Sequence, residues 1–363
     1  MHVLEPLTDE DERRLTEALR VHFGVDVVQW RRLGGELDIN YRAILAGGDA
    51  RCHTGGTVTG AGDARSVRFV RLSPAPFDEA SLSWQNAVLE QLERSPLSVA
   101  TPVLQRGVDE GVEAPFTSLD GREFRIRVTT WIPGSNVSEL GVVGALYRRR
   151  LGALAAEIPE SLAPLVDRRE GLIEHHWVAV RAGTSIRETW HAVDQPDRRA
   201  LLEEAVRRFD VIEARLSHLP MAAVHQDLHD FNLLAERAAA DGAVRITGIV
   251  DFNDAVITVR VAELAVAAVY AALRQRDAFE AFTDVVEGYL AHTSLTDDEL
   301  TVLYPLAVAR LAVNGSTWTA RAGQGNRAYA ESRMSAAWPA LRQLLAVDPE
   351  QAESRFRALT PRP

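Results

Sequence analysis

The sequence contains no lysine, since all 40 of the Lys and Arg residues among its 363 positions are arginine. This absence excludes enzymes that form a Schiff base on a lysine amine, including those that anchor pyridoxal phosphate. It also excludes a Walker-type phosphate-binding loop, which requires its lysine. Codon drift in a GC-rich genome accounts for the absence and agrees with the richness in Ala, Arg and Val. Where a phosphate-binding site needs a cation, this chain must supply arginine.

Cysteine is almost absent too. A single one, Cys52, leaves no disulfide framework and is typical of a reducing compartment. The longest apolar run, 261–273, is interrupted by Glu263 and is too short to span a bilayer. The first residues, MHVLEPLTDEDERR, are too acidic and polar for a signal peptide. We therefore predict a cytoplasmic protein that does not act at a membrane.

Basic side chains are fewer than acidic ones, which gives a formal net charge of −11. A nucleic-acid-binding protein would need a basic face, so the charge argues against that class and favours cationic ligands. Apolar residues make up 46% and charged residues 25%, as in an ordinary globular protein, and the length suggests about two domains.

The first third of the chain has a β-rich pattern. Thr8, followed by three acidic residues, predicts an N-capped helix that runs to about residue 23. A segment rich in Gly, Thr and Asp, 47–66, predicts a long exposed hairpin loop. Strand-like runs lie at 25–33, 41–45, 67–72, 103–105 and 123–131, and a second helical pattern lies at 77–92.

After a break at Pro133 and Gly134, the pattern becomes helical, with one strand–loop–strand segment, 222–254, embedded in it. The predicted helices are 138–158, 196–216, 261–274, 277–292, 297–313 and 329–345. We predict an α+β, bilobal protein with a small β-rich N-lobe, 1–131, and a larger, mainly helical C-lobe, 132–363.

The embedded segment contains the candidate catalytic and metal-binding residues. It contains H-x-D-x-x-x-x-N, formed by His225, Asp227 and Asn232, and then an apolar strand that ends at Asp251. Phosphoryl transfer needs a group that orients the attacking hydroxyl and hard oxygen ligands for the Mg²⁺ that bridges the phosphates. Asp227 suits the first role as a base, and Asn232 with Asp251 suits the second.

Each of these residues has a plainer interpretation. Asp and Asn are common in polar turns, and His225 fits a structural role in which it holds the loop by hydrogen bonds. His225 and His229 have the i, i+4 spacing of a zinc pair, with Asp251 as a third ligand, but the segment does not read as a helix. Asp254 fits either a contact with a substrate amine or the cap of the following helix.

With these motifs the sequence resembles the aminoglycoside-phosphotransferase and choline-kinase type of small-molecule kinases, a branch of the protein-kinase-like fold. It is most similar to the hydroxylysine-kinase-like group. The family's H-G-D-x-x-x-x-N is matched with Gln226 in place of Gly, and its second motif is matched by VDFND at 250–254. Further similar stretches are LGGELDINYRA, WQNAVLEQL, RVTTWIPG, ARLAVNGSTWTAR and NRAYAESRMSAAW. The stretch 310–321 resembles a family segment near the substrate, although helix packing explains it equally well.

The resemblance also implies a nucleotide site in the N-lobe. Gly34 and Gly35, followed by Asn40, form the turn that would cover the phosphates, although a simple hairpin turn explains them as well. The family's lysine corresponds to Arg71, and the facing helix residue corresponds to Gln85. A guanidinium can bind phosphate in bidentate fashion, so the exchange is compatible with nucleotide binding.

The hinge backbone, at Thr130 and Ile132, would hold the base of the nucleotide. The sequence thus predicts a kinase that uses ATP or GTP with Mg²⁺ to phosphorylate a hydroxyl group of a small polar molecule. The family implies an amine-bearing acceptor such as an amino alcohol, a hydroxy amino acid, an aminoglycoside or a natural-product intermediate. The alternative is a nucleotide-binding pseudokinase that regulates or scaffolds a partner, which Arg71 favours and the complete set of Asp227, Asn232 and Asp251 opposes.

Overall fold

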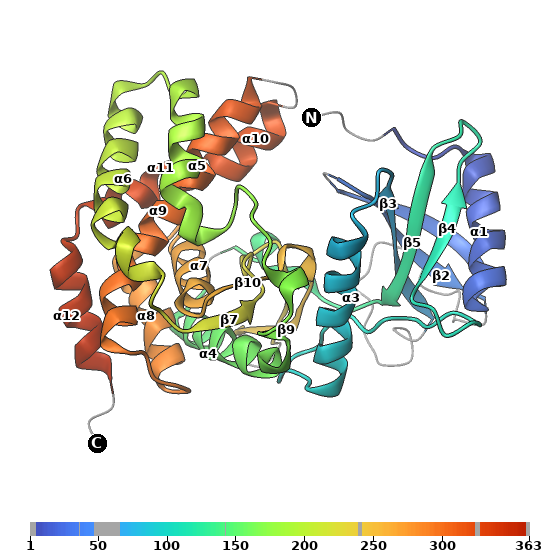
Figure 1. The fold of residues 1–363 in the computed structure, drawn as a ribbon, viewed down its shortest axis with the longest axis horizontal. Helices are drawn as coiled ribbons and strands as arrows, with labels where there is room; N and C mark the ends of the chain where they lie inside the picture. The colour runs from blue at the N-terminus through green and yellow to red at the C-terminus, as the bar shows by residue number, and fades with distance from the viewer. Residues whose placement is uncertain are drawn as a thin grey trace. The chain divides into compact units, whose positions relative to one another are not determined.

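The computed structural model describes residues 5–35, 37–46, 66–141, 143–238, 242–323 and 327–360. The chain divides into two compact units, coloured from blue to red along the chain in Figure 1. The N-terminal unit is His2–Ser135 with Thr247–Val250, and the C-terminal unit is Asn136–Ile246 with Asp251–Pro363. Cys52 and all but the last residue of the loop expected at 47–66 lie outside the described residues.

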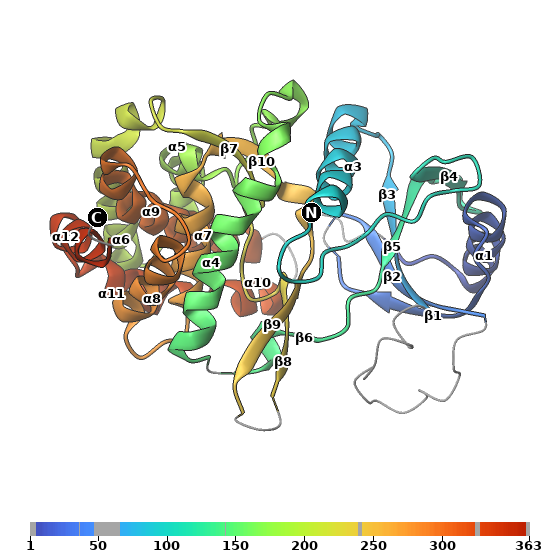
Figure 2. The same ribbon diagram turned by 90° about the horizontal axis from the view of Figure 1, so that it is seen from below.

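The N-terminal unit is built on a five-stranded antiparallel sheet in the order β1-β2-β3-β5-β4. Helices α1 and α3 cover opposite faces of this sheet (Figures 1 and 2). The elements are α1 (Asp9–Phe23), β1 (Val27–Leu33), β2 (Ile39–Leu45), β3 (Val67–Pro74), α3 (Glu79–Arg94), β4 (Glu113–Thr117) and β5 (Glu123–Thr130).

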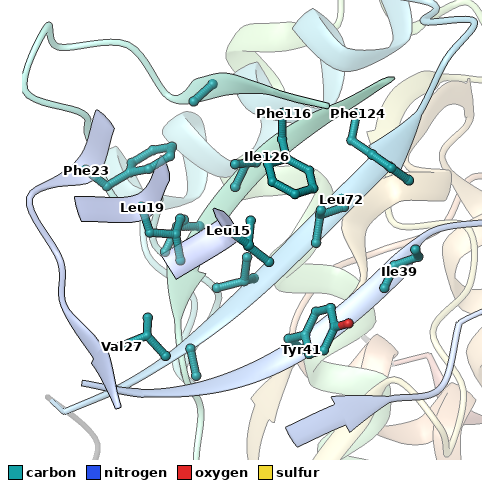
Figure 3. Packing of buried hydrophobic residues seen from close by; sticks show 14 of the residues in the cluster. Leu15, Leu19, Phe23, Val27, Ile39, Tyr41, Leu72, Phe116, Phe124 and Ile126 are labelled. Carbon is teal, nitrogen blue, oxygen red and sulfur yellow. The ribbon is translucent and has the colours of Figure 1, made fainter. Parts of the chain in front are cut away.

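Helix α1 begins where its sequence predicts. The Thr8 hydroxyl accepts a hydrogen bond from the Asp11 amide at 3.1 Å, and the Asp11 carboxylate accepts one from the Thr8 amide. Leu15, Leu19 and Phe23 follow at four-residue spacing, so they share one face of the helix. Figure 3 shows this face packed on the buried side chains of the sheet, which form the apolar core of the unit.

The C-terminal unit is mainly helical, and two small sheets accompany its helices. Strand β7 pairs with β10, while β8 pairs with β9 and with the two-residue β6. The strands that follow β5 are β6 (Ser135–Asn136), β7 (Met221–Val224), β8 (Leu233–Arg237), β9 (Val244–Ile249) and β10 (Val256–Val259). The α-helices of the unit are α4 (Ala145–Ser161), α5 (Ala182–Thr189), α6 (Pro196–Leu216), α7 (Val261–Ala271), α8 (Ala278–Leu290), α9 (Asp297–Ala322), α10 (Arg327–Met334), α11 (Ala337–Leu345) and α12 (Pro349–Leu359).

The structure corrects several predicted boundaries. The helix expected at 138–158 begins only at Ala145, and the strand expected at 103–105 is a single bridge from Leu104 to Thr129. The helix expected to end at 313 continues to Ala322, because burial on all sides outweighs the low helix propensity of the Asn-Gly-Ser-Thr sequence there. The helix expected at 329–345 is two helices, and α5 and α12 were not predicted.

No helix within the described ranges combines the length and the apolar character that a membrane span requires. The most apolar helix, α7, is buried inside the C-terminal unit, where ten of its eleven residues are shielded from solvent. This burial explains the longest apolar run of the sequence.

Helices α4 and α8 approach each other at two glycines. A Cβ atom on Gly152 would lie 1.9 Å from the Val285 carbonyl oxygen, and one on Gly288 would lie 1.9 Å from the Arg149 carbonyl oxygen. Both neighbours are backbone atoms of the facing helix, so neither can move without shifting that helix. The two glycines let the backbones of α4 and α8 come into van der Waals contact, and α7 packs against both helices.

We predict that Gly288→Ala destabilises the protein by about 2 kcal/mol or more, because the new methyl group overlaps backbone atoms of α4. Urea unfolding followed by circular dichroism measures the change. The matched control is Gly323→Ala, whose new methyl group would meet one atom of the described residues, the Ala320 carbonyl oxygen, at 3.5 Å. Equal unfolding midpoints for the two variants would contradict the packing argument.

Candidate active site

The loop between β7 and β8 contains the predicted H-x-D-x-x-x-x-N residues, all within the C-terminal unit. His225 is buried, and its Nδ1 atom accepts a hydrogen bond from the Asp227 amide at 3.2 Å. Its ring also packs on Phe252, with 4.5 Å between the ring centroids. The structural role predicted for His225, to hold the loop by a side-chain hydrogen bond, is confirmed.

A buried carboxyl group on α7 anchors the start of this loop. Glu263 Oε2 accepts hydrogen bonds from the His225 amide at 2.6 Å and from the Gln226 amide at 3.2 Å. Gln226 has φ of 68°, the left-handed conformation that glycine adopts without strain, which explains why the related motif has Gly at this position. Here the Gln226 side chain is buried and donates to the Trp177 carbonyl at 3.3 Å, which compensates part of that strain.

Asp227 lies at the centre of a polar network. Its Oδ2 atom lies 3.0 Å from His229 Nε2 and accepts a hydrogen bond from Asn232 Nδ2 at 3.0 Å. Its Oδ1 atom lies 3.4 Å from an Arg310 guanidinium nitrogen. The Phe231 amide donates to His229 Nδ1 at 3.1 Å, so the proton of a neutral His229 is on Nε2 and points at Asp227.

These neighbours determine the charge of Asp227. Burial on its own raises the pKa of a carboxyl group, but the His229 imidazole and the Arg310 guanidinium outweigh it and hold the pKa of Asp227 well below its usual range. The carboxylate therefore stays ionised and fixed in orientation at neutral pH. It can accept a hydrogen bond from a hydroxyl group and receive its proton when that oxygen acquires a new bond.

Asn232 and Asp251 offer oxygen atoms that suit a hard cation. Both Asn232 Nδ2 bonds go to Asp227, one to its carbonyl at 3.0 Å and one to its carboxylate, and Asn232 Oδ1 accepts none within the described residues. Asp251 follows β9 with φ of 65°, which leaves its carboxylate exposed beside the Asn253 amide group that donates to it. An amide oxygen and a carboxylate are the ligand types that Mg²⁺ takes, so the donor set fits the ion.

The zinc alternative has no support in the geometry. The Nδ1 atoms of His225 and His229 both accept backbone hydrogen bonds, and His229 Nε2 is directed at Asp227. Across the part of the chain that the structure describes, no group of three or more His, Cys, Asp or Glu side chains is arranged to hold a metal ion.

Asp254 closes a short 3-10 turn, Phe252–Asp254, and is exposed. It does not cap the next helix, because β10 intervenes and Arg260 occupies the cap of α7.

The predicted phosphate-binding residues lie together in the N-terminal unit. Asn40 Nδ2 donates to the Gly34 carbonyl at 3.1 Å, which closes the turn between β1 and β2. A Cβ atom on Gly35 would lie 2.5 Å from the Asp38 carbonyl oxygen, so this tight turn requires glycine there. Arg71 lies opposite Asn40 in the β2–β3 register and forms an ion pair with Asp38 of the same turn.

The sequence did not predict Arg127, which lies beside Arg71 in the β3–β5 register. It is buried and donates to Gln85 Oε1 and to Asn86 Oδ1 on α3, both at 3.1 Å. Gln85, the helix residue expected to face Arg71, thus binds a second arginine. On the side of the sheet that faces α3, Asn40, Arg71 and Arg127 lie in one row across three strands.

The predicted hinge residues differ in their backbone contacts. The Thr130 amide donates to the Val103 carbonyl at 2.9 Å, and the Thr130 hydroxyl accepts from the Val103 amide at 3.1 Å. The Thr130 amide is therefore already used in a hydrogen bond within the protein. Ile132 lies beyond the end of β5, and its backbone groups make no hydrogen bond within the described residues. Its side chain is buried against Gly248.

Sequence reasoning also missed the residues that surround Asp227 from other elements. Arg310 of α9 is buried between Trp177 and Tyr270, and it donates to the Tyr270 hydroxyl at 2.8 Å. The sequence signal for Arg310 is the stretch 310–321, which helix packing explains equally well at the level of sequence. Burial and Arg310 lower the pKa of His175 to about 4, against the opposing effect of Asp227, so His175 is neutral at physiological pH.

Comparison with known proteins places these features in a family. The sequence model of the Phosphotransferase enzyme family matches residues 58–300. A hydroxylysine kinase from Bos taurus is 25% identical over 209 residues, which cover 56% of this chain and 54% of that protein. One from Mus musculus is 23% identical over 232 residues, which cover 61% of each chain. This chain therefore spans between half and about three fifths of the length of the curated relatives it matches.

Two solved structures resemble the whole chain. An amicoumacin kinase, solved with AMP-PNP, Ca²⁺ and Ami, aligns with a TM-score of 0.62 at 15% identity over 94% of this chain and 97% of that one. A microcompartment-associated aminopropanol kinase aligns with a TM-score of 0.63 at 16% identity over 96% and 100%. At these identities the likeness establishes the fold. The predicted α+β fold of the protein-kinase-like class, with a β-rich N-terminal part and a mainly helical C-terminal part, is confirmed.

We predict that Glu263 makes stability depend on pH. Burial raises the pKa of Glu263 from 4.5 to about 8, since two backbone hydrogen bonds only partly offset the loss of solvation. Between these pH values the folded protein holds a proton that the unfolded chain has released, so stability falls as pH rises from about 5 to 8. Glu263→Gln, which keeps an acceptor oxygen, lacks this dependence.

The measurement is the melting temperature of both proteins at pH 5, 6.5 and 8. The wild type should lose stability relative to Glu263→Gln by up to about 1.4 kcal/mol per pH unit within this range. Glu263→Ala should be less stable than either protein at every pH, because two buried amides lose their acceptor. A constant difference between wild type and Glu263→Gln would disprove the raised pKa.

Proposed function

The chain belongs to the Phosphotransferase enzyme family, and from this premise we propose that it is a kinase that phosphorylates a hydroxyl group of a small polar, amine-bearing molecule. It uses ATP or GTP as donor and Mg²⁺ as cofactor. The observation that carries the proposal is the fixed Asp227 carboxylate, held by His229, Asn232 and Arg310 in one network.

Asp227 is the catalytic base in this proposal. It accepts a hydrogen bond from the acceptor hydroxyl and so directs the oxygen at the terminal phosphorus of the nucleotide. As the new O–P bond forms, the bond to the bridging oxygen of the nucleoside diphosphate breaks, and the hydroxyl proton passes to Asp227. The low pKa of Asp227 makes it a weak base, so the proton transfers late and orientation is the larger part of its contribution.

Asn232 and Asp251 would hold Mg²⁺, which when bound neutralises charge on the phosphates of the nucleotide. Asn232 links the two functions, because its amide nitrogen holds Asp227 while its oxygen is left to the cation. Asp254, exposed on the turn that follows Asp251, would contact the acceptor amine.

The N-terminal unit would bind the nucleotide. The turn at Gly34 and Gly35, closed by Asn40, would approach the phosphates through its backbone, and Arg71 would bind them with its guanidinium. In this structure Arg71 forms an ion pair with Asp38. A bound phosphate would therefore displace the Asp38 carboxylate from Arg71 or share the guanidinium with it. The backbone at Thr130 and Ile132 would contact the base, with Ile132 offering unused backbone groups.

We expect Asp227→Asn to lower kcat by about 10³-fold or more while nucleotide affinity stays within about threefold, because the amide cannot take the proton. A phosphate-transfer screen over amino alcohols, hydroxy amino acids and aminoglycosides provides the assay. Asp230→Asn is the matched control: it lies in the same loop and pairs with Arg274. Its Oδ1 atom is 3.8 Å from His229 Nδ1, which already accepts the Phe231 amide, so the variant should keep activity within about threefold of wild type. Turnover by Asp227→Asn equal to wild type would refute the proposal, and nucleotide binding without transfer to any acceptor would favour the pseudokinase.

Arg71→Lys should retain or raise activity, because it restores the cation usual at this position and keeps a charge opposite Asp38. Arg71→Met should weaken nucleotide binding by about tenfold or more, since the phosphate then lacks its cation. Calorimetric titration with AMP-PNP and Mg²⁺ measures both. Arg68→Met, on the same strand but facing the other side of the sheet, is the control and should leave the affinity within about twofold. A folded Arg71→Lys protein without nucleotide affinity would show that another residue binds the phosphates.

A further inference from the structure

A chain of stacked guanidinium and aromatic groups begins at Asp227. The Arg310 guanidinium, which contacts Asp227, lies 5.0 Å from the centre of the Trp177 ring. Arg321 lies on the same Trp177 ring at 5.3 Å and on the Trp318 ring at 4.7 Å. All these residues belong to the C-terminal unit.

The chain of contacts closes on the catalytic loop. Arg333 of α10 lies over the Trp318 ring at 5.8 Å and over the Phe231 ring at 4.2 Å. Phe231 contacts the ring of His229, with 5.8 Å between centroids, and His229 holds Asp227. The contacts therefore form a closed circuit, which we call the arginine–aromatic ring and which consists of Asp227, Arg310, Trp177, Arg321, Trp318, Arg333, Phe231 and His229.

The inner and outer members of this ring differ in exposure. Arg310 and Trp318 are buried, at 1% and 4% exposure, whereas Phe231 is 38% exposed. Arg321 and Arg333 are half-buried between them. A molecule whose hydroxyl reaches Asp227 would thus meet these two guanidinium groups on aromatic faces that hold them in place.

The charge of the ring is positive. Arg310 is paired with Asp227, and Arg333 adds a guanidinium group that faces the Phe231 ring. Arg333 makes no ion pair with a carboxylate within the described residues. The adjacent His175 adds no charge, and its buried Nε2 atom has no hydrogen-bond partner in the described structure. Such a surrounding repels an ammonium group and attracts an anion.

We propose that the acceptor carries a carboxylate beside its hydroxyl group and that Arg321 and Arg333 bind this carboxylate. The inference rests on the proposed function, because it defines the acceptor of the same reaction. A planar guanidinium fork matches the two oxygens of a carboxylate, and stacking on Trp318 and Phe231 orients the fork in advance. Arg321 and Arg333 are specificity-determining residues, and a hydroxy amino acid would present its carboxylate to them and its amine to Asp254.

The experiment compares acceptors in pairs that differ only in the carboxylate: serine with ethanolamine, homoserine with 3-aminopropan-1-ol, and hydroxylysine with its methyl ester. The carboxylate member of the preferred pair should show at least tenfold higher kcat/KM. Arg333→Gln should raise KM for that acceptor at least tenfold while kcat stays within about threefold, since binding is lost before the chemical step. Arg333→Lys should give an intermediate KM, and neither variant should alter KM for the carboxylate-free member.

Arg327→Gln is the matched control. Arg327 lies on the same helix, is exposed and pairs with Glu331, so its loss should leave KM unchanged. Equal use of both members of every pair, or an equal rise in KM for both members in Arg333→Gln, would overturn the inference. A loss of AMP-PNP affinity in Arg333→Gln at unchanged KM for the carboxylate acceptor would overturn it as well, because the guanidinium would then bind the phosphates.

A binding measurement separates this inference from the proposed function. Titration of the protein and its Arg333→Gln variant with the carboxylate compounds, in the presence of AMP-PNP and Mg²⁺, requires no turnover. Asp227-dependent transfer to carboxylate-free acceptors, with kcat/KM equal to that of their carboxylate partners, would sustain the kinase proposal and overturn the carboxylate inference. Carboxylate binding that weakens tenfold in Arg333→Gln, without transfer to any acceptor, would sustain the carboxylate-binding role of Arg333 and overturn the kinase proposal.

Discussion

The geometry of the candidate active site depends on one buried carboxyl group. Glu263 accepts the amides of His225 and Gln226 at the point where the chain leaves β7 and turns into the catalytic loop. With this anchor Gln226 can adopt a left-handed conformation, and the turn then directs Asp227 toward His229 and Arg310. The cost of burying Glu263 appears as its raised pKa, so part of the stability of α7 is used to hold the polar backbone of the catalytic loop.

The sequence predicted those parts of the site that depend on local chemistry. The spacing of Asp227 and Asn232 brings them together because one loop of eight residues contains both, and the role of His225 follows from its hydrogen bond within that loop. The turn at Gly35 was predictable for the same reason, since only residues of the turn itself crowd it. The α1 cap is another example, because Thr8 and Asp11 need only each other.

Contacts between distant segments could not be predicted in this way. Arg127 binds Gln85 because β5 lies beside β3 under α3, and nothing in the local sequence of β5 indicates that arrangement. Arg310 is 83 residues from Asp227 and reaches it because α9 packs against α7, where the same guanidinium donates to the Tyr270 hydroxyl. Helix α9 also runs on past residue 313, where its sequence alone predicts an end. Gly315 illustrates why that helix continues: its lack of a side chain admits the Trp338 ring, a tertiary contact that outweighs the helix-breaking tendency of glycine.

The net charge of −11 describes the whole surface and misleads about this site. On that average alone a cationic acceptor would be expected, but solvent-exposed charges farther than about 8 Å are largely screened at physiological ionic strength, so the groups next to Asp227 dominate its field. There the chain places arginines on aromatic rings, an arrangement suited to guanidinium, whose delocalised plane can stack while its edge donates. An ammonium group in their place would need solvation that the rings do not provide. The exclusive use of arginine, whatever its origin in codon usage, thus leaves a site in which stacking and ion pairing can act on the same residue.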